Sequence, residues 1–124
     1  MNAIDESLQR RFEEAIRRLI FVGFNSRVAA VDRDTGEVVW QWKAPKGTST
    51  YVALLLDGDR LIASVQGYTY CLNPLNGEQI WVNPLKGFGI GVPCLASVRG
   101  TSSSAASAAG EVLDQARRSA EGAG

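Results

Sequence analysis

AVDRDTGEVVW, residues 30–40, and CLNPLNGEQIW, residues 71–81, are two copies of one pattern set 41 positions apart. In each copy a glycine follows the opening residue by six positions, and a tryptophan follows that glycine by four. The apolar runs that precede the copies, residues 20–22 and 61–63, keep the same offset. The chain therefore carries one structural unit twice in tandem.

The glycine and the tryptophan of each copy predict a turn followed by a docking side chain. Gly36 and Gly77 lie among Asp, Asn and Thr residues, which favour tight turns with positive φ and side-chain hydrogen bonds to the turn amides. Trp40 and Trp81 follow on the next strand, where a large flat ring can cover turn backbone and bury apolar surface between units. A period of ~40 residues with such turns is typical of the four-stranded blade of a β-propeller.

The pattern resembles the tryptophan-docking motif of PQQ-like propeller repeats, Ala-x-Asp-x-x-x-Gly-x-x-x-Trp, where PQQ is pyrroloquinoline quinone. The first copy matches all four positions, whereas the second has Cys71 and Asn73 in place of Ala and Asp, which predicts a looser docking contact. The resemblance covers residues 20–99 and implies a fold, since such propellers serve both enzymes and non-enzymatic scaffolds. The structural docking residues are expected to be Ala30, Asp32, Gly36, Trp40, Cys71, Asn73, Gly77 and Trp81.

Hydrophobic periodicity divides the chain into a helix, a two-blade region and a tail. Residues 1–19 are predicted to form an amphipathic helix, and residues 100–124 a flexible tail rich in Ser, Ala and Gly with a marginal helix. The fold class is mainly β, with two four-stranded antiparallel blades in residues 20–99. The predicted strands are 20–24, 27–32, 37–43, 51–56, 60–65, 68–73 and 78–83, and an eighth run spans 90–98.

The charge balance and the composition of the chain limit the classes of partner that it is expected to bind. Thirteen basic and thirteen acidic residues balance, so we expect no nucleic-acid partner. No run of 18 apolar residues is present and the first twenty residues are charged throughout, so we expect no membrane partner and a cytoplasmic location. Cys71 and Cys94 lie in predicted strands among apolar neighbours, which favours buried free thiols over a disulfide.

The sequence offers little for catalysis. It has no histidine, and its two cysteines are 23 positions apart with no CxxC motif, so we expect no metal site. The resemblance to quinoprotein dehydrogenases would imply vicinal cysteines over the quinone and a calcium site with a catalytic Asp, and the chain has no vicinal cysteines. We expect no catalytic residues, and we favour a non-catalytic role over enzymatic activity. We also expect no bound cofactor, with PQQ binding as the alternative.

The strand count predicts assembly. Three strands, then four, then one make two blades in which the last strand belongs with the opening three. Propellers need ~4 to 8 blades, and two blades alone leave apolar faces in water. We therefore expect a protein-interaction scaffold built by self-assembly, as a homo-tetramer with eight blades or a homo-trimer with six, binding an unknown protein partner. The alternatives are a propeller that binds a small molecule or a quinone, and a fragment that completes a propeller on a larger partner.

Overall fold

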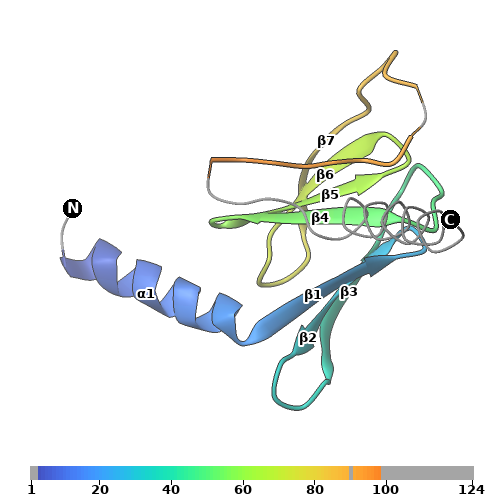
Figure 1. Ribbon diagram of the computed structural model, residues 1–124. Coiled ribbons are helices and arrows are strands. Elements are labelled where there is room, and N and C mark those ends of the chain that lie inside the picture. The colour runs from blue at the N-terminus through green and yellow to red at the C-terminus, as the bar shows by residue number, and fades with distance from the viewer. Residues whose placement is uncertain (1–2, 90, 99–124) are drawn as a thin grey trace, which may run out of the picture.

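The structure, a computed structural model, describes residues 3–89 and 91–98 (Figure 1). One helix and seven strands follow each other along the chain. They are α1 (Ala3–Arg17), β1 (Leu19–Phe24), β2 (Arg27–Asp32), β3 (Val38–Lys43), β4 (Val52–Asp57), β5 (Arg60–Val65), β6 (Tyr68–Leu72) and β7 (Gln79–Asn83).

The seven strands form two antiparallel sheets. The first has the order β1-β2-β3 and the second the order β4-β5-β6-β7, so each is a meander of sequence neighbours. The prediction of a mainly β fold with an N-terminal helix is confirmed. The second sheet has the four strands of a complete blade, whereas the first has three.

The prediction of a strand at 90–98 is wrong for the described part, 91–98, which forms no strand apart from an isolated bridge residue at Ala96. A fourth strand of the first sheet would have to lie along β1. Instead the Ser97 hydroxyl donates a 3.0 Å hydrogen bond to the carboxylate of Asp57, at the end of β4. The segment therefore lies by the second sheet and leaves the first incomplete. The predicted tail at 100–124 lies outside the described residues.

The hydrophobic core lies between the two sheets. The side chain of Tyr70 on β6 is 1% exposed, and its ring packs edge-on against Trp42 of β3 with centroids 4.7 Å apart. Its hydroxyl donates to the carbonyl of Lys46 at 2.6 Å and accepts from the amide of the same residue at 3.1 Å, which fixes the loop between the sheets. The buried cluster comprises Val28, Ala30, Trp40, Ala44, Val52, Leu61, Ala63, Val65, Tyr70 and Leu72.

Helix α1 extends away from the sheets and joins them only near its C-terminal end (Figure 1). It ends at Arg17, two residues before the predicted limit, because Leu19 already pairs with Asp32 as the first residue of β1. Leu8 on its apolar side is 56% exposed, while Phe12 and Ile16 are half-buried. Among the described residues no helix is long and apolar enough to cross a membrane.

Candidate functional site

The side chain of Trp40 reaches from β3 onto the turn that links β6 and β7. It is 8% exposed, and its Nε1 donates a 2.9 Å hydrogen bond to the carbonyl of Pro74. Gly77 lies against the ring, and a Cβ at that position would overlap it. Because no other residue leaves this space free, Gly77 is required by both the close approach and its φ of 75°.

Backbone and side-chain hydrogen bonds hold the turn under Trp40 in shape. The amide of Gly77 donates to the carbonyl of Asn73 at 2.8 Å, and the amide of Asn73 donates to the carbonyl of Glu78 at 2.8 Å. The Asn73 side-chain oxygen accepts from the amide of Leu75 at 2.9 Å. Asn73 thus performs the turn-forming role expected of the motif's Asp, since either side chain can accept from amides that follow it.

The equivalent turn between β2 and β3 has the same geometry. Gly36 has a φ of 75°, and its amide donates to the carbonyl of Asp32 at 2.8 Å. The Asp32 carboxylate accepts from the amides of Asp34 and Thr35, at 2.8 Å and 3.2 Å. The first turn is therefore built as a docking surface like the second.

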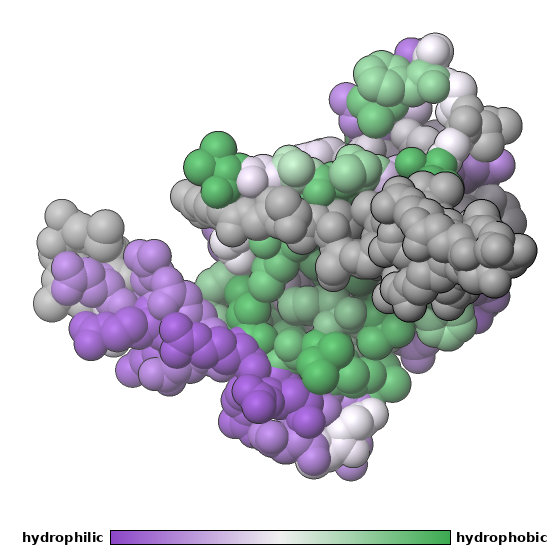
Figure 2. All heavy atoms as spheres, in the orientation of Figure 1, coloured by the Kyte–Doolittle hydropathy of each residue, from purple (hydrophilic) through white to green (hydrophobic). Residues whose placement is uncertain are grey.

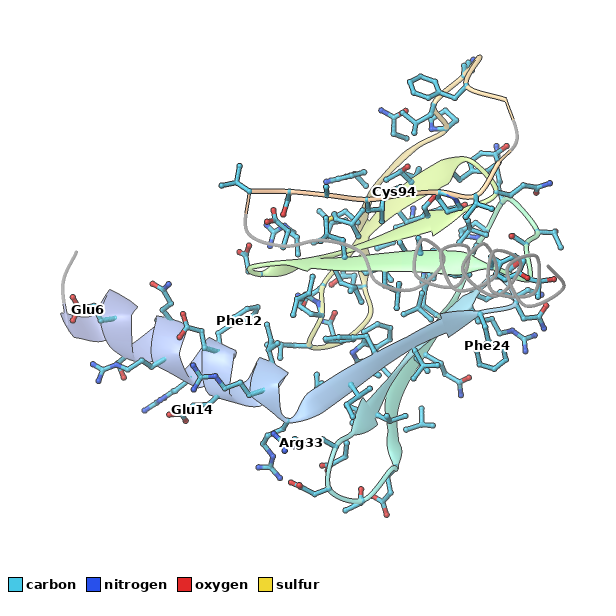
Figure 3. All side chains as sticks on the ribbon, in the orientation of Figure 1. Glu6, Phe12, Glu14, Phe24, Arg33 and Cys94 are labelled. Carbon is cyan, nitrogen blue, oxygen red and sulfur yellow. The ribbon has the colours of Figure 1, made fainter. Side chains whose placement is uncertain are left out.

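No side chain lies on that first turn in the described structure. Nothing is within 4 Å of the place where a Cβ on Gly36 would stand. Arg33 is the repeat equivalent of Pro74, and its carbonyl accepts no hydrogen bond from a described residue. Its side chain extends into solvent near the end of α1 (Figure 3). No ring of a described residue therefore covers the turn at Gly36 as Trp40 covers the turn at Gly77.

Trp81 is the repeat equivalent of Trp40, but its side chain is not buried by the described residues. It is 44% exposed on β7, and its neighbours Ile80 and Val82 are each 45% exposed. Its ladder partner Cys71 is fully buried, as is Ala30 opposite Trp40. Burial raises the pKa of the Cys71 thiol, while Arg60 lowers it and Asp59 raises it by smaller amounts. Cys71 is thus a small neutral residue beneath the ring.

The outer face of the first sheet is apolar and open. Alternate residues of β1 point outward on this face, and Figure 2 shows hydrophobic residues gathered over the first sheet. Their repeat equivalents on β5 are buried between the sheets. The exposed set is Ile20 at 51%, Val22 at 39% and Phe24 at 64%; the equivalents are Leu61 at 1%, Ala63 at 0% and Val65 at 0%. The open face is therefore the repeat copy of a face that the molecule buries.

The sequence analysis identified the tryptophans and glycines, but neither the Pro74 carbonyl that accepts from Trp40 nor its repeat equivalent, the Arg33 carbonyl. The side chains at this position differ, and because the acceptor is backbone, residue type carries no signal for it. The expectation of a buried thiol was wrong for Cys94, which is exposed because 91–98 does not enter a sheet. Both cysteines are free.

One large cavity lies elsewhere, between α1 and the turn that links β4 and β5. It has a volume of about 760 Å³ and is lined on the helix side by Leu8, Phe12 and Ile16, and on the turn side by Gly58 and Asp59. Among the described residues no group of three His, Cys, Asp or Glu side chains could hold a metal ion.

Comparison with known proteins agrees with the repeat. A family model described as outer membrane protein assembly factor BamB matches residues 25–116, more than half of the chain. Quinoprotein alcohol dehydrogenase PedH of Pseudomonas putida is 32% identical over 77 residues, which cover 53% of this chain and 13% of PedH.

A solved structure is also similar to this chain. The crystal structure of BamB from Moraxella catarrhalis is 26% identical, with a TM-score of 0.41, over 66% of this chain and 22% of that protein. The chain thus spans less than a quarter of either relative. With the family match over residues 25–116 and the two repeated motifs, the chain belongs to the BamB-type family of PQQ-like propeller-repeat proteins.

Proposed function

We propose that this protein is a non-catalytic interaction scaffold whose copies join head to tail into a propeller. Trp81 of one copy covers the turn at Gly36 of the next and donates its Nε1–H to the carbonyl of Arg33. The observation that carries this proposal is the filled contact of Trp40 with Gly77 and Pro74. The same chain bears both halves of a second such contact, each open.

The open faces provide a driving force for this contact. Burying a Val, Leu, Ile or Phe side chain fully contributes about 1.5 to 3 kcal/mol. Ile20, Val22 and Phe24 at one end and Trp81 at the other are all partly in water. Because these four side chains are already about half-buried, completing their burial would contribute on the order of 3 to 6 kcal/mol. This is a sizeable part of the ~5 to 15 kcal/mol by which a domain is stable, so a partner that covers both ends is favoured.

Such a contact is heterologous, because one end of the chain meets the opposite end of its neighbour. Heterologous contacts close into a ring when the rotation between copies fits, and otherwise extend into filaments. Four copies would form eight blades and three copies six, both within the range of known propellers. We propose the tetramer first and the trimer second, with the channel and outer turns available to a further protein.

The test is the solution mass from size-exclusion chromatography with light scattering. We expect four or three times the 13.3 kDa chain mass, unchanged on dilution, and a loss of that mass in Trp81→Ala. The matched control is Phe88→Ala, because Phe88 is 77% exposed and lies outside the motif. A 13.3 kDa wild-type species would overturn the proposal.

A second candidate occupant is a larger propeller on another polypeptide. The chain spans 13% of PedH and 22% of the Moraxella BamB structure, which favours a role as part of a larger ring. The two open ends would then meet blades of that partner rather than of a second copy. Aggregation of the chain alone, relieved by co-expression with the partner, would support this candidate over self-assembly.

PQQ binding remains the third candidate. The described residues do not fit a calcium–quinone site of the dehydrogenase type, because the two cysteines are not adjacent and no three-ligand acidic cluster is present among them. We therefore derive no step through PQQ. Titration of the purified protein with PQQ and Ca²⁺ tests it, and an unchanged quinone absorbance would reject it.

We also propose a cytoplasmic location. The two free cysteines are consistent with a reducing compartment, where disulfides are rare. Fractionation of cells that express the chain tests this, and recovery from a periplasmic or outer-membrane fraction would contradict it.

A further inference from the structure

The first sheet lacks the strand that begins a blade. In the second sheet β4 lies along β5, with Leu54 opposite Ala63 and Leu56 opposite Leu61. In the first sheet β1 corresponds to β5, and no described strand lies along its outer edge. Among the described residues the only pairing there is a single bridge from Phe24 to Tyr51, at the end of β1. No described residue pairs with the remaining edge, towards Leu19.

Residues 92–98 are the repeat equivalent of the strand that would fill this edge. At the offset of 41 positions they correspond to residues 51–57, which contain β4. Leu95 then corresponds to Leu54, and Ser97 to Leu56. The distance along the chain from Trp81 to this segment equals the distance from Trp40 to β4, so the connection has the length that the filled interface uses.

The segment lies on the side where a following blade would begin. The hydrogen bond from Ser97 to Asp57 places it at β4, the first strand of the last blade, and not at β1 of its own chain. Figure 3 shows Cys94 on this stretch beside β4, far from Arg33 and the turn that β2 leads into. Within one chain the segment therefore lies by β4 and not along the edge of β1, and a second copy can bring such a segment to that edge.

We infer that residues 91–98 of one copy pair with β1 of the next copy as its missing innermost strand, antiparallel, with Leu95 opposite Val22 and Ser97 opposite Ile20. This inference rests on the head-to-tail assembly proposed above and adds its register. The register follows from the pairing of β4 with β5, moved by one repeat. A second copy is the occupant because Trp81, which fits the same neighbouring blade, directly precedes this segment in the chain.

The proline in the segment supports this register. In a hairpin with a two-residue turn the closing pair is hydrogen-bonded and the pairs alternate from there. Counted from Asp57–Arg60, the pair Val52–Val65 is then not hydrogen-bonded. Pro93, the equivalent of Val52, falls opposite Phe24 at such a position, where its missing N–H breaks no ladder bond. A slip of one residue would place Pro93 at a bonding position and turn every side chain to the wrong face.

The faces also agree with the proposed register. Val22 is 39% exposed on the open apolar face, and Leu95 would join it there as Leu54 joins Ala63. Cys94 would lie on the opposite face, at the place that corresponds to Ala53, which is fully buried. Strand addition would therefore extend the apolar face and remove the exposed Cys94 from water.

The test is a disulfide between two differently marked copies. V22C/C94S is mixed with C94S/L95C, so that a bond between Cys residues at 22 and 95 can form only between chains, and the mixture is oxidised mildly. Facing residues in a non-hydrogen-bonded pair have the close Cβ atoms that a disulfide needs. We expect a linked dimer of one chain of each kind on a non-reducing gel.

The matched control is V22C/C94S mixed with the wild-type chain, whose native Cys94 tests a register one residue away. Because adjacent strand residues point to opposite faces, we expect linking to be on the order of tenfold slower in this control. Equal or faster linking to Cys94 would overturn the register. The oligomeric mass of the same samples is measured by light scattering under reducing conditions.

The two measurements separate this inference from the proposed function. An oligomeric mass without the 22–95 bond would overturn strand addition and leave head-to-tail docking intact. A monomeric mass without the bond would overturn both. An oligomeric mass with the bond supports both, and protection of Cys94 from a thiol reagent in the wild-type oligomer is expected with it.

Discussion

Trp40 and Trp81 occupy the same position of the same motif, yet one is 8% exposed and the other 44%. The difference does not come from the strands that carry them, because each tryptophan lies opposite a fully buried small residue in its ladder. Trp40 has a second blade to cover and Trp81 has none among the described residues. A docking motif therefore specifies half of an interface, and its burial depends on the neighbour.

The turns at Gly36 and Gly77 also have the same local structure but different surroundings. The glycines of both have a φ of 75° and both donate to the carbonyl four residues before them at 2.8 Å. One turn is covered by a ring and the other is open. Since the local geometry is equal, substitutions at equivalent positions should differ mainly in whether they act on folding or on assembly.

The largest difference is expected between Trp40→Ala and Trp81→Ala. Removing a buried Trp costs about 3 to 5 kcal/mol of unfolding free energy, and Trp40 also donates to Pro74. In the disassembled chain Trp81→Ala should change the unfolding free energy by less than about 1 kcal/mol, because the side chain is partly in water. Urea unfolding of dilute protein checks this. Equal losses in the two variants would contradict the comparison.

The second-largest difference in stability is expected between substitutions at Gly77 and at Gly36. Gly77→Ala places a methyl group in the Trp40 ring and holds a non-glycine residue at positive φ, which we expect to cost about 2 to 4 kcal/mol. Gly36→Ala incurs only the backbone term of ~1 kcal/mol within one chain. Thermal unfolding of both variants measures the difference. A larger loss for Gly36→Ala would show that the first turn is not open.

The sheet faces give a smaller contrast. Leu61→Ala removes a core side chain and should cost about 2 to 5 kcal/mol, whereas Ile20→Ala at the equivalent, half-exposed position should cost about 1 kcal/mol or less in a single chain. Ile20→Ala should instead reduce the assembled fraction. Denaturant melts and light scattering on the same samples separate these effects. If Ile20→Ala lost as much unfolding free energy as Leu61→Ala, another part of the same chain would have to cover Ile20.

Removal of one hydrogen bond should have an effect of about 0.5 to 1.5 kcal/mol. Trp40→Phe keeps an aromatic ring on Gly77 but lacks the donor to the Pro74 carbonyl. Trp81→Phe has no such bond to lose in one chain. Denaturant melts should show the loss only for Trp40→Phe, and an unchanged melt there would mean that ring packing alone holds the contact.

The smallest expected effect is a pH dependence at Cys71. Burial raises the pKa of this thiol above its ordinary value of 9.0. The unfolded chain then loses the proton at lower pH than the folded one, so the stabilisation is complete below pH 9 and declines as the pH rises through the folded pKa. Cys71→Ala should flatten the fall in unfolding free energy above pH 9, and an identical slope would assign the fall to other groups.

Much of the fold could be predicted from the sequence, because the repeat determines both the spacing of the strands and the positions of the turns. β2 and β5 have the predicted limits; β1, β3, β6 and β7 differ from the prediction by one residue at one end, and β4 by one residue at each end. The segment at 90–98 was expected as a strand because it is an apolar run that leads, after a turn, towards the next blade, as residues 51–56 do. Strand formation also needs an edge to pair with, and residues 91–98 form no ladder with a described strand.

The docking site could be predicted only in part. The motif identified Gly77 and Trp40, because its spacing requires a glycine and a tryptophan at these two positions. The Arg33 and Pro74 carbonyls are backbone groups and are independent of residue type. The open face of β1 was equally hidden, because Ile20, Val22 and Phe24 look in sequence like the buried residues of β5.

The most direct test of the account uses two variants that are each blocked at one end. Trp81→Ala leaves the turn at Gly36 able to accept a ring, and Gly36→Leu fills that turn while leaving Trp81 able to dock. We predict that each variant alone has the mass of one chain and that an equal mixture forms a complex of two chains, measured by light scattering. Two unmixed single-chain species, or a wild-type chain that is itself a monomer, would contradict the claim that the two open ends are made for each other.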